Sequence, residues 1–456
     1  MDLIEVCKRC NTGPVVKETE YDLEIVFPKM KEVIQKYKIK YDANNPVPDD
    51  DDLADRVFQA AVDYFSEVGA YCKDTQKIAR FNRKEILESC KKENRPVCIG
   101  GEGDDRKEWV PRKPDDNSRP WCHIGSGIYS SSADVAMRLI EGYASIGRAD
   151  SMAIPTLSHY KNEAISPGHP FEVLGAIENM RVARRARKNV GREGFPVFNV
   201  VPTAATAIGT IPASYPDFGA RRSDGWLVAI YPEFKLRIDS LNKVAFLKEI
   251  GANFCGEASA LLGGYAGGPE GVAVASTVYS FFTSMIYEGT YHLNFPVTLS
   301  GAIATTRPLL WALSLGSQAA ARNNYVAWYN SGHVANGPAT ENYFYESAAY
   351  ILSSVPAGVT TGTPFPCAGV KKDGMTPQEA LFHTEMADAV TGMTRKEANE
   401  IVKKLLEKYE PSLSAPNKGR TYQECFDLKT NQPDGEYRRL YDKVKKELSL
   451  LGVNFQ

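Results

Sequence analysis

Residues 257–268 read Glu-Ala-Ser-Ala-Leu-Leu-Gly-Gly-Tyr-Ala-Gly-Gly, a lone carboxylate followed by four glycines that flank Tyr265 and Ala266. Glycine permits a positive φ and a close approach of the backbone to a ligand. A short apolar run at 252–255 precedes the stretch, and a helix-like run at 272–287 follows it. A buried strand, a glycine-rich loop and a helix form the unit that carries active sites in α/β barrels. We therefore predict a strand–loop–helix unit, whose loop is either functional or a tight structural turn.

The same alternation continues on both sides of this unit from about residue 120. Apolar runs typical of strands lie at residues 121–124, 151–154, 196–201, 226–230, 252–255, 291–295, 325–328 and 358–361. Helices are expected after them, for example at residues 171–190, 244–250, 306–322, 341–354 and 377–390. Eight strand–helix units predict an α/β fold, a closed (β/α)8 TIM barrel. An open doubly wound sheet is the alternative, but no Gly-x-Gly-x-x-Gly follows the first strand.

Two segments are predicted to lie outside the barrel. Residues 1–120 are interpreted as an N-terminal helical extension, because an apolar stripe at helical spacing begins at Leu53, after four acids at 49–52. Within this extension, residues 101–117 are charged and poorly periodic and are expected to form a loop. The barrel is assigned to residues 121–395, and the charged residues 396–456 to C-terminal helices packed on it.

Composition excludes several classes of partner. The formal net charge of the 456 residues is −2, which argues against nucleic acid because phosphate binding needs a basic surface. The most apolar stretch, 271–287, is interrupted by Ser and Thr, so we expect a buried helix and no membrane span. The chain opens without the features of a signal peptide, and its nine cysteines form no disulfide framework, so a cytoplasmic location is predicted. No metal is predicted, because Cys7 and Cys10 lack further ligands and the six histidines share no ligand spacing.

Candidate functional residues follow the carboxyl ends of the predicted strands, where barrels carry their sites. Glu257 is the candidate acid or base, because a carboxylate in an apolar, glycine-lined pocket can have a raised pKa. Pairing with a lysine or arginine is the alternative role for it. The candidate substrate-binding residues are Phe198, Asn199, Glu233, Tyr265, Ser331, His333 and Asn336.

Five collinear segments resemble one known family. Residues 262–268 are similar to the Gly-Gly-Tyr-Ala-Gly-Gly motif of the archaeal monomethylamine methyltransferases, with the motif's upstream glutamate at Glu257. The other matching segments are 69–75, 170–174, 338–341 with 346–349, and 419–430. The resemblance covers almost the whole chain and implies a (β/α)8 barrel in a symmetric hexamer. It also implies methyl transfer to the cobalt(I) of a corrinoid (cobalamin) that a partner protein carries, so no tightly bound cofactor is expected.

One departure from the family limits what the resemblance implies. The family's pyrrolysine falls at the end of the third strand, where this chain has Phe198, or Asn199 with one residue of slippage. Two polar residues that flank pyrrolysine in the family also look changed, to Leu227 and Ser331. Of the family's site residues considered, only the glutamate is matched in this chain, at Glu257.

Without the electrophilic imine of pyrrolysine, the substrate should carry its own activated leaving group, such as a quaternary ammonium, a sulfonium or an aryl methyl ether. Aromatic faces attract quaternary ammonium ions, so Phe198 would suit a cation, with Tyr265, Trp226 and Trp328 as further cage residues. The predicted function is pyrrolysine-independent methyl transfer from a small methylated, cationic donor, in which Glu257 binds the cation or moves a proton. Two alternatives stay open: a methoxy or thioether donor, and a non-catalytic small-molecule-binding barrel.

Overall fold

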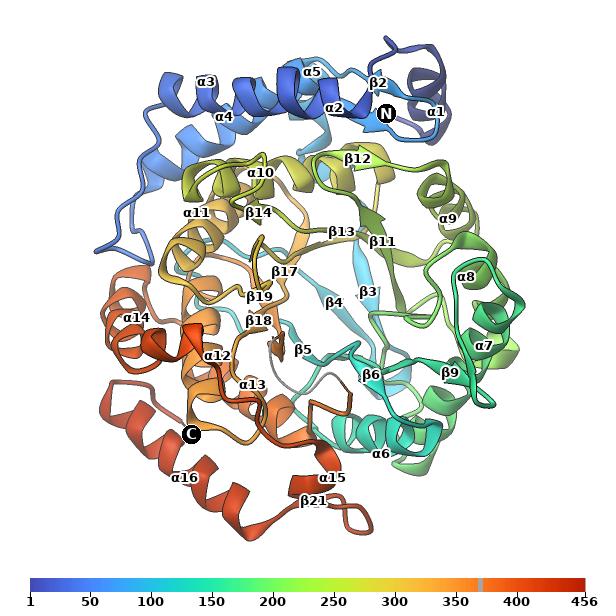
Figure 1. Ribbon diagram of the computed structural model, residues 1–456, viewed down its shortest axis with the longest axis vertical. Coiled ribbons are helices and arrows are strands. Elements are labelled where there is room, and N and C mark those ends of the chain that lie inside the picture. The colour runs from blue at the N-terminus through green and yellow to red at the C-terminus, as the bar shows by residue number, and fades with distance from the viewer. Residues whose placement is uncertain (368–371, 456) are drawn as a thin grey trace.

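The computed structural model describes residues 1–367 and 372–455 and contains a closed parallel barrel (Figure 1). Seven strands form one sheet, in the order β11 (Gly225–Ile230), β13 (Asn253–Ala258), β15 (Tyr291–Asn294), β17 (Ala327–Asn330), β19 (Thr360–Gly362), β5 (Cys122–Gly125) and β7 (Ser151–Ala153). The predicted third strand, 196–201, is irregular, but it joins the two edges of this sheet. Phe198 N donates to Met152 O at 2.8 Å, and Gly225 N donates to Val197 O at 2.8 Å. The ring is thus complete, and the predicted TIM barrel is confirmed.

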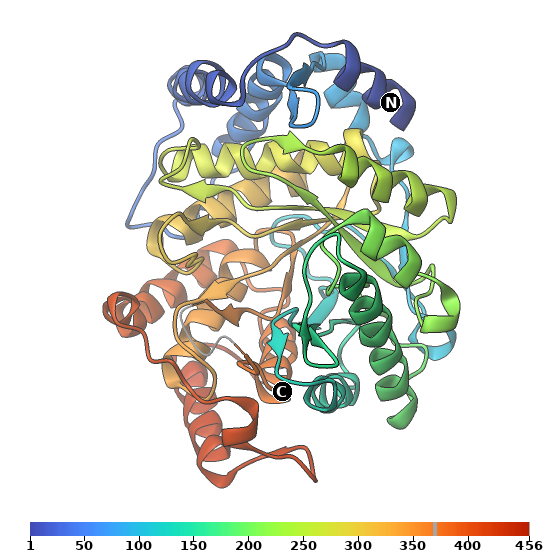
Figure 2. The ribbon, with the colours of Figure 1, turned by 45° about the vertical axis from the view of Figure 1, so that its right-hand side comes forward.

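Helices follow the strands and surround the barrel (Figures 1 and 2). They are α6 (Ala133–Ala144), α7 (Pro170–Asn189), α8 (Ala207–Ala213), α9 (Ile238–Glu249), α10 (Pro269–Phe281), α11 (Arg307–Asn323), α12 (Glu341–Ser354) and α13 (Pro377–Ala389). Their starts are encoded locally. Thr340 caps α12 by accepting from Tyr343 N, and α13 begins with a capping box of Thr376 and Glu379.

The N-terminal segment covers one side of the barrel, at the top of Figure 1. It contains α1 (Leu3–Thr12), α2 (Glu18–Glu20), α3 (Phe27–Lys36), α4 (Asp51–Val68), β1 (Ala70–Cys72), β2 (Lys77–Ala79) and α5 (Arg83–Ser89). The expected helix after Leu53 is α4, and Asp50 caps it. The loop after β11 supplies β12 (Lys235–Leu236), which pairs in parallel with β1 and so ties the segment to the barrel.

The C-terminal segment packs on the opposite side of the barrel (Figure 1). It contains α14 (Arg395–Tyr409), α15 (Tyr422–Cys425), the short β21 (Phe426–Asp427) and β22 (Gln432–Pro433), and α16 (Gly435–Leu450). None of the helices in the described part of the chain is both long and apolar enough to cross a membrane.

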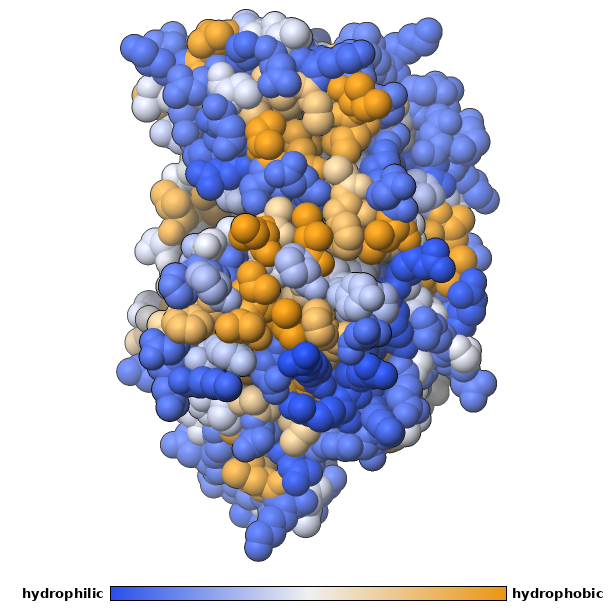
Figure 3. Space-filling view, turned by 90° about the vertical axis from the view of Figure 1, so that its right-hand side faces the viewer, coloured by the Kyte–Doolittle hydropathy of each residue, from blue (hydrophilic) through white to orange (hydrophobic). Residues whose placement is uncertain are grey.

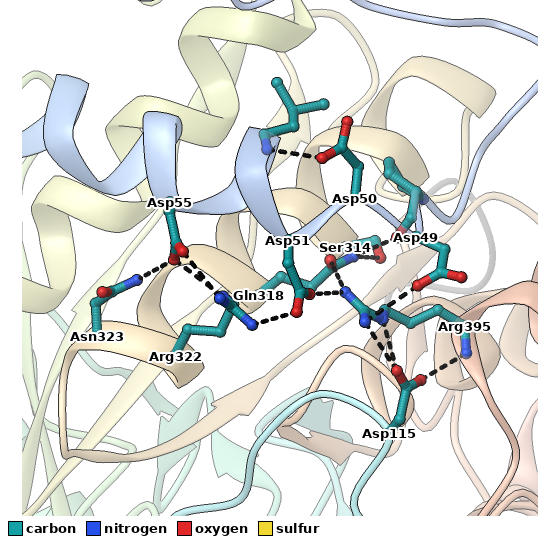
Figure 4. A network of polar contacts seen from close by, with 12 residues as sticks. Asp49, Asp50, Asp51, Asp55, Asp115, Ser314, Gln318, Arg322, Asn323 and Arg395 are labelled. Carbon is teal, nitrogen blue, oxygen red and sulfur yellow. Dashed lines mark hydrogen bonds and ion pairs between the residues drawn. The ribbon is translucent and has the colours of Figure 1, made fainter.

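Arg395 joins three regions through the network in Figure 4. Its guanidinium lies 3.1 Å from Asp49 and 2.8 Å from Asp51, both at the start of α4. It also lies 2.8 Å from Asp115, which precedes the first barrel strand, and donates to Gln318 of α11 at 2.8 Å. The acids before α4 therefore do more than favour its dipole: they connect the N-terminal helix to the C-terminal helix α14.

The amino end of the barrel is closed by a hairpin that the sequence did not predict. β3 (Cys98–Gly100), just before the segment expected to be a loop, pairs with β4 (Lys107–Trp109) inside that segment, and both strands lie inside the ring in Figure 1. Trp109 stacks on Trp121 at 5.4 Å, and Trp121 stacks on Phe198 at 5.7 Å. These buried rings form an aromatic floor under the barrel interior.

At the carboxyl end, the loops that follow the strands pair with one another. Three two-stranded parallel ladders form there: β6 (Tyr129–Ser130) with β8 (Thr156–Leu157), β14 (Leu261–Leu262) with β16 (Val297–Thr298), and β18 (His333–Val334) with β20 (Phe365–Pro366). We call these three ladders the collar. It extends the barrel wall beyond the strands and so places their carboxyl ends below the molecular surface.

Candidate functional site

Glu257 lies on strand β13 and faces the barrel interior. The strand runs further than the predicted 252–255, so Glu257 belongs to the strand and not to the glycine loop. In the parallel register, Ala229, Glu257, Leu293 and Tyr329 stand at one level, because each pairs with the next across neighbouring strands. Leu293 and Tyr329 belong to the cluster that fills the barrel, which shows that this face points inward.

Solvent reaches part of the barrel interior around Glu257 but not the aromatic floor. Glu257 and its neighbours Leu227 and Ala229 are half-buried, although they point inward. One level lower, Cys255 and Tyr291 are fully buried on the aromatic floor. The interior is therefore open toward the collar and closed toward the amino end of the barrel.

The Glu257 carboxylate accepts no hydrogen bond from any residue in 1–367 or 372–455, and no ion pair reaches it there. Burial raises its pKa to about 7, because the surrounding apolar groups disfavour the charged form, and Lys243 offsets part of this effect. The Lys243 ammonium itself donates to Ala205 O at 2.7 Å. Pairing with a basic side chain, the alternative role considered for Glu257, is thus absent from the described contacts.

Three other buried glutamates show what a structural carboxylate looks like in this fold. Glu172 accepts from Ala205 N at 2.7 Å and from Gly168 N at 2.7 Å. Glu346 accepts from Ala335 N at 2.7 Å and from Asn336 N at 2.9 Å, and Glu379 accepts from its own helix cap. Each fastens a loop at the carboxyl end of the barrel. Glu257, which is half-buried, has no described partner of this kind, so its carboxylate is not committed to holding a loop.

Aromatic rings and one hydroxyl group stand above Glu257. Phe295 continues β15 two positions after Leu293, its amide donates to Ala258 O at 3.0 Å, and its ring lies 5.8 Å from the His333 ring. The His333 ring lies 4.2 Å from the Phe365 ring in the collar. Ser331 follows β17, with its amide bonded to Asn294 O at 2.9 Å. All of these side chains except Asn294 are half-buried.

His333 adds no positive charge to this region. Burial lowers its pKa to about 4, so the ring is neutral near pH 7. Its Nδ1 lies 3.0 Å from the Ala302 carbonyl oxygen, which requires Nδ1 to carry the proton. The region thus combines one unpaired carboxylate with neutral aromatic rings, an arrangement that suits a small organic cation.

Of the candidate substrate-binding residues, the structure brings Ser331 and His333 near Glu257. Tyr265 lies at the tip of the glycine loop and is partly exposed. Phe198 lies in the floor, fully buried between Trp121 and Tyr291, so its ring has no face open to a ligand. The expectation that it contacts a cation is therefore not supported by the geometry.

Asn199 and Asn336 are occupied by the protein. Asn199 clamps Ile154 by accepting from its amide at 2.8 Å and donating to its carbonyl at 2.9 Å. Asn336 is fully buried and donates to Glu346 at 2.8 Å and to Ser412 at 2.9 Å. Both asparagines shape loops, and both N–H groups of the Asn336 side chain are already used within the protein.

Trp226 and Trp328, the further cage candidates, point out of the barrel. Trp226 donates to Ser214 at 2.9 Å, and Trp328 donates to Asn330 at 2.8 Å, in both cases on the helix side of the sheet. The rings that line the interior instead include Tyr329, whose pKa is raised by burial and by the nearby Cys255 and Glu257. The alternation of side chains along 325–330 places Trp328 and Tyr329 on opposite faces of the strand. The sequence alone does not show which of the two faces points into the barrel.

Glu233 supports the glycine loop from behind. It is buried, one of its carboxylate oxygens has no partner, and burial together with the charge of Asp22 raises its pKa to about 7. Tyr265 N donates to this carboxylate, and Gly264 lies against it. Glu233 therefore lies on the N-terminal segment's side of the loop, away from the group around Glu257.

Neither a metal cluster nor a disulfide is present near the cysteines singled out from the sequence. Cys7 and Cys10 are free thiols, and Cys10 is fully buried. In residues 1–367 and 372–455, no group of three or more His, Cys, Asp or Glu side chains is placed to hold a metal ion.

Known proteins of one family match this chain along almost its whole length. The family profile of monomethylamine methyltransferase MtmB matches residues 1–453. The MtmB1 and MtmB2 proteins of Methanosarcina barkeri (strain Fusaro) and MtmB of Methanosarcina mazei are each 27% identical over 456 residues, covering 100% of this chain and 98% of theirs.

Two solved structures share the fold. The crystal structure of the Methanosarcina barkeri monomethylamine methyltransferase superposes with a TM-score of 0.95 at 27% identity, covering 100% of this chain and 99% of that one. A hydroxylamine complex of MtmB gives a TM-score of 0.95 at 26% identity, with the same coverage. The chain belongs to the monomethylamine methyltransferase MtmB family.

Proposed function

We propose that this chain is a corrinoid-dependent methyltransferase that works without pyrrolysine and takes its methyl group from a small cationic donor, a quaternary ammonium compound first of all. The acceptor is the cobalt(I) of a corrinoid carried by a partner protein. The observation that carries the proposal is the unpartnered Glu257 carboxylate at the open level of the barrel, under the rings of Phe295 and His333.

The fully buried Phe198 supports the view that pyrrolysine has no counterpart here. At the position expected for pyrrolysine, the side chain is part of a packed floor and not a reactive group. The substrate then has to be held by charge and shape. A carboxylate next to aromatic faces does this for a quaternary ammonium ion, which offers no hydrogen bond donor.

The proposed reaction needs no proton donor, because the leaving group departs as a neutral amine. The electron pair of cobalt(I) forms the new bond to the methyl carbon, and the electron pair of the C–N bond leaves with a neutral tertiary amine. Glu257 binds and orients the cation, and the rings exclude water from the methyl group. Once the charge is gone, the attraction to Glu257 is lost, which favours release of the amine.

The pKa of about 7 at Glu257 favours one alternative chemistry, because a carboxyl group that is partly protonated at neutral pH can donate a proton. In that case the donor would be a methyl ether or thioether, and Glu257 would protonate the leaving alkoxide or thiolate. The two chemistries require opposite protonation states of the same group, so the pH dependence of the reaction separates them.

A donor panel tests the proposal. The purified protein is incubated anaerobically with cob(I)alamin and, separately, quaternary amines, methylamines, methyl ethers and thioethers, while methylcobalamin is followed by absorbance. We expect methylcobalamin with a quaternary ammonium donor. Methyl transfer from an ether or thioether alone would favour the alternative chemistry, and tight binding of a donor without transfer to any corrinoid would favour a binding barrel.

We further propose a homo-oligomer, a hexamer, located in the cytoplasm. Figure 3 shows apolar side chains gathered on the flank that carries α8 and α9. The exposed large apolar residues of this flank include Ile208 and Tyr215. Such exposure is typical of a surface covered by another subunit. The free thiols of Cys7 and Cys10 suit a reducing compartment.

A further inference from the structure

Two polar atoms besides the Glu257 carboxylate open into the barrel interior without a protein partner. The Tyr329 hydroxyl and His123 Nε2 make no hydrogen bond to any residue in 1–367 or 372–455. Other buried atoms without a partner, such as the Tyr143 hydroxyl and His292 Nε2, are sealed from solvent, but these two are not. Both residues are otherwise deeply buried, with exposed fractions of 3% and 4%. Their only available partner is therefore water or a ligand inside the barrel.

Both side chains share the interior with Glu257. His123 lies two positions after Trp121 of the floor and so faces the same side of its strand, and its ring lies 4.9 Å from the Tyr329 ring. Tyr329 stands at the level of Glu257, two strands away. The strand of His123, β5, is directly opposite the strand of Glu257, β13, because three strands separate them on either side. An eight-stranded barrel is just wide enough for side chains to fill, so a small molecule beside Glu257 can also reach His123 and Tyr329.

Neighbouring residues fix which nitrogen of His123 carries the proton. Trp121 Nε1 donates to Ser151 Oγ at 2.8 Å, and this oxygen lies 2.9 Å from His123 Nδ1. Ser151 Oγ has no other partner in the part of the chain that the structure describes, so its own proton is donated to Nδ1. Burial, with a smaller effect of His383, lowers the pKa of His123 to about 3, so the ring is neutral. Its single N–H group is therefore at Nε2, the atom that opens into the interior.

We propose that Tyr329 and His123 together bind an acceptor oxygen of the methyl donor, so that the substrate is a quaternary ammonium compound that also bears a hydroxyl or carboxylate group. We call these two residues the donor pair. The inference rests on the proposed function for the reaction, although binding itself needs no methyl transfer. The pair offers an O–H and an N–H group side by side, whereas ionised Glu257 offers only acceptors. A purely hydrocarbon substituent would displace water from both groups and leave them unpaired, which is costly.

The depth of the donor pair sets the orientation of the compound. The His123 ring lies 6.4 Å from the Phe198 ring of the floor, whereas Phe295 stands above Glu257 on the side of the collar. A compound held at both ends places its oxygen toward the floor and its ammonium group beside Glu257. Its methyl groups then face the open end of the barrel, where the cobalt(I) has to reach them.

Calorimetry with matched compounds tests the donor pair. The probes are trimethylammonium compounds that carry a 2-hydroxyethyl, a carboxymethyl or a propyl group, and the propyl group has the size of the hydroxyethyl group but no oxygen. Tyr329→Phe removes the hydroxyl and leaves the ring. Tyr143→Phe is the matched control, because the Tyr143 hydroxyl is also buried and unpartnered but is sealed from solvent. His123→Leu removes the N–H donor, whereas His123→Gln keeps one near the position of Nε2.

Wild type should bind at least one oxygen-bearing compound about tenfold or more tightly than the propyl compound, since two hydrogen bonds are gained. Tyr329→Phe should lower this ratio by about fivefold without weakening binding of the propyl compound, and Tyr143→Phe should leave the ratio unchanged. His123→Leu should lower the ratio more than His123→Gln does. The proposal is overturned if wild type binds the propyl compound as tightly as both others, or if Tyr329→Phe leaves the ratio unchanged.

Failure of the proposed function gives a different pattern. If no compound transfers a methyl group to cob(I)alamin but the preference for oxygen persists and Tyr329→Phe lowers it, the reaction is refuted and the donor pair is supported. If methyl groups are transferred with equal KM values from the propyl and the oxygen-bearing compounds, the reaction stands and the donor pair is refuted. Wild type that binds none of the three compounds contradicts both.

Discussion

Glu257 differs from Glu172, Glu346 and Glu379 in making no described hydrogen bond that supports the structure. Glu172, Glu346 and Glu379 fasten loops through hydrogen bonds, whereas Glu257 has no described partner. Replacing Glu257 should therefore cost little stability but affect binding. In the proposed reaction the positive charge disappears as the methyl group leaves, so the carboxylate stabilises the bound donor at least as well as the transition state.

Glu257→Gln should accordingly raise the KM for a cationic donor more than it lowers kcat. Loss of a charged partner in a half-buried site corresponds to an increase of about tenfold to a hundredfold in KM. Steady-state kinetics with free cob(I)alamin measure both constants. A large fall in kcat at unchanged KM would mean that Glu257 acts on the leaving group instead.

Phe295 should contribute to binding of the cationic donor through the face of its ring. Phe295→Leu keeps an apolar side chain of similar size but removes the attraction to a cation, worth about 1 kcal/mol, so the affinity for the donor should fall by about fivefold. Binding of a neutral analogue of the same shape is the control and should change little. Equal losses for the charged and neutral compounds would indicate packing and not a cation–π contact.

At the scale of elements, the glycine loop is held against the start of helix α10. A Cβ on Gly271 would lie 1.8 Å from Ala266 O, and the loop closes on itself through Gly263 N and Gly267 O at 2.9 Å. Gly263 and Gly267 have φ values of +89° and +76°, which other residues rarely adopt. The loop shape thus depends on close approach and on left-handed backbone, together with the hydrogen bond from Tyr265 N to the Glu233 carboxylate.

Gly271→Ala should therefore displace the loop and lower methyl transfer. Alanine favours a helix over glycine by about 1 kcal/mol, so any loss of activity or stability has to come from the contact with Ala266. Gly147→Ala is the control, because a Cβ at Gly147 meets nothing within 4 Å. Activity and thermal unfolding of the two variants check this prediction, and equal behaviour would contradict it.

The sequence predicted some elements better than others for physical reasons. Strands with dense apolar runs, such as β11 and β15, and helices with caps, such as α12, were placed closely because local patterns encode them. The hairpin β3–β4 was missed because Lys107 and Glu108 are polar and exposed, and the one buried residue of β4, Trp109, finds partners only inside the folded barrel. Glu257 could be singled out beside the glycines, but its lack of partners could not, since partners come from distant residues.

At the scale of the whole molecule, Arg395 connects the two terminal segments directly, on the flank of the barrel that carries α11. Its nearly buried guanidinium forms ion pairs with Asp49, Asp51 and Asp115 (Figure 4). Removing the guanidinium would leave these three carboxylates close to one another without a positive charge. Arg395→Ala should destabilise the protein by about 3 kcal/mol or more, the cost of breaking such a pair. Denaturant unfolding measures it. Lys403→Ala, which removes an exposed ion pair with Glu400, is the control and should cost about 0.5 kcal/mol.

The most direct measurement of the central claim is the pH dependence of kcat/KM for methyl transfer to cob(I)alamin, in wild type and in Glu257→Gln. The pKa of Glu257 is about 7, and a cationic donor needs the ionised form, so kcat/KM should fall by about tenfold from pH 8 to pH 6. The variant should show a flat profile over that range. A profile that rises as the pH falls, or one that Glu257→Gln leaves unchanged, would contradict a carboxylate that holds a cationic methyl donor.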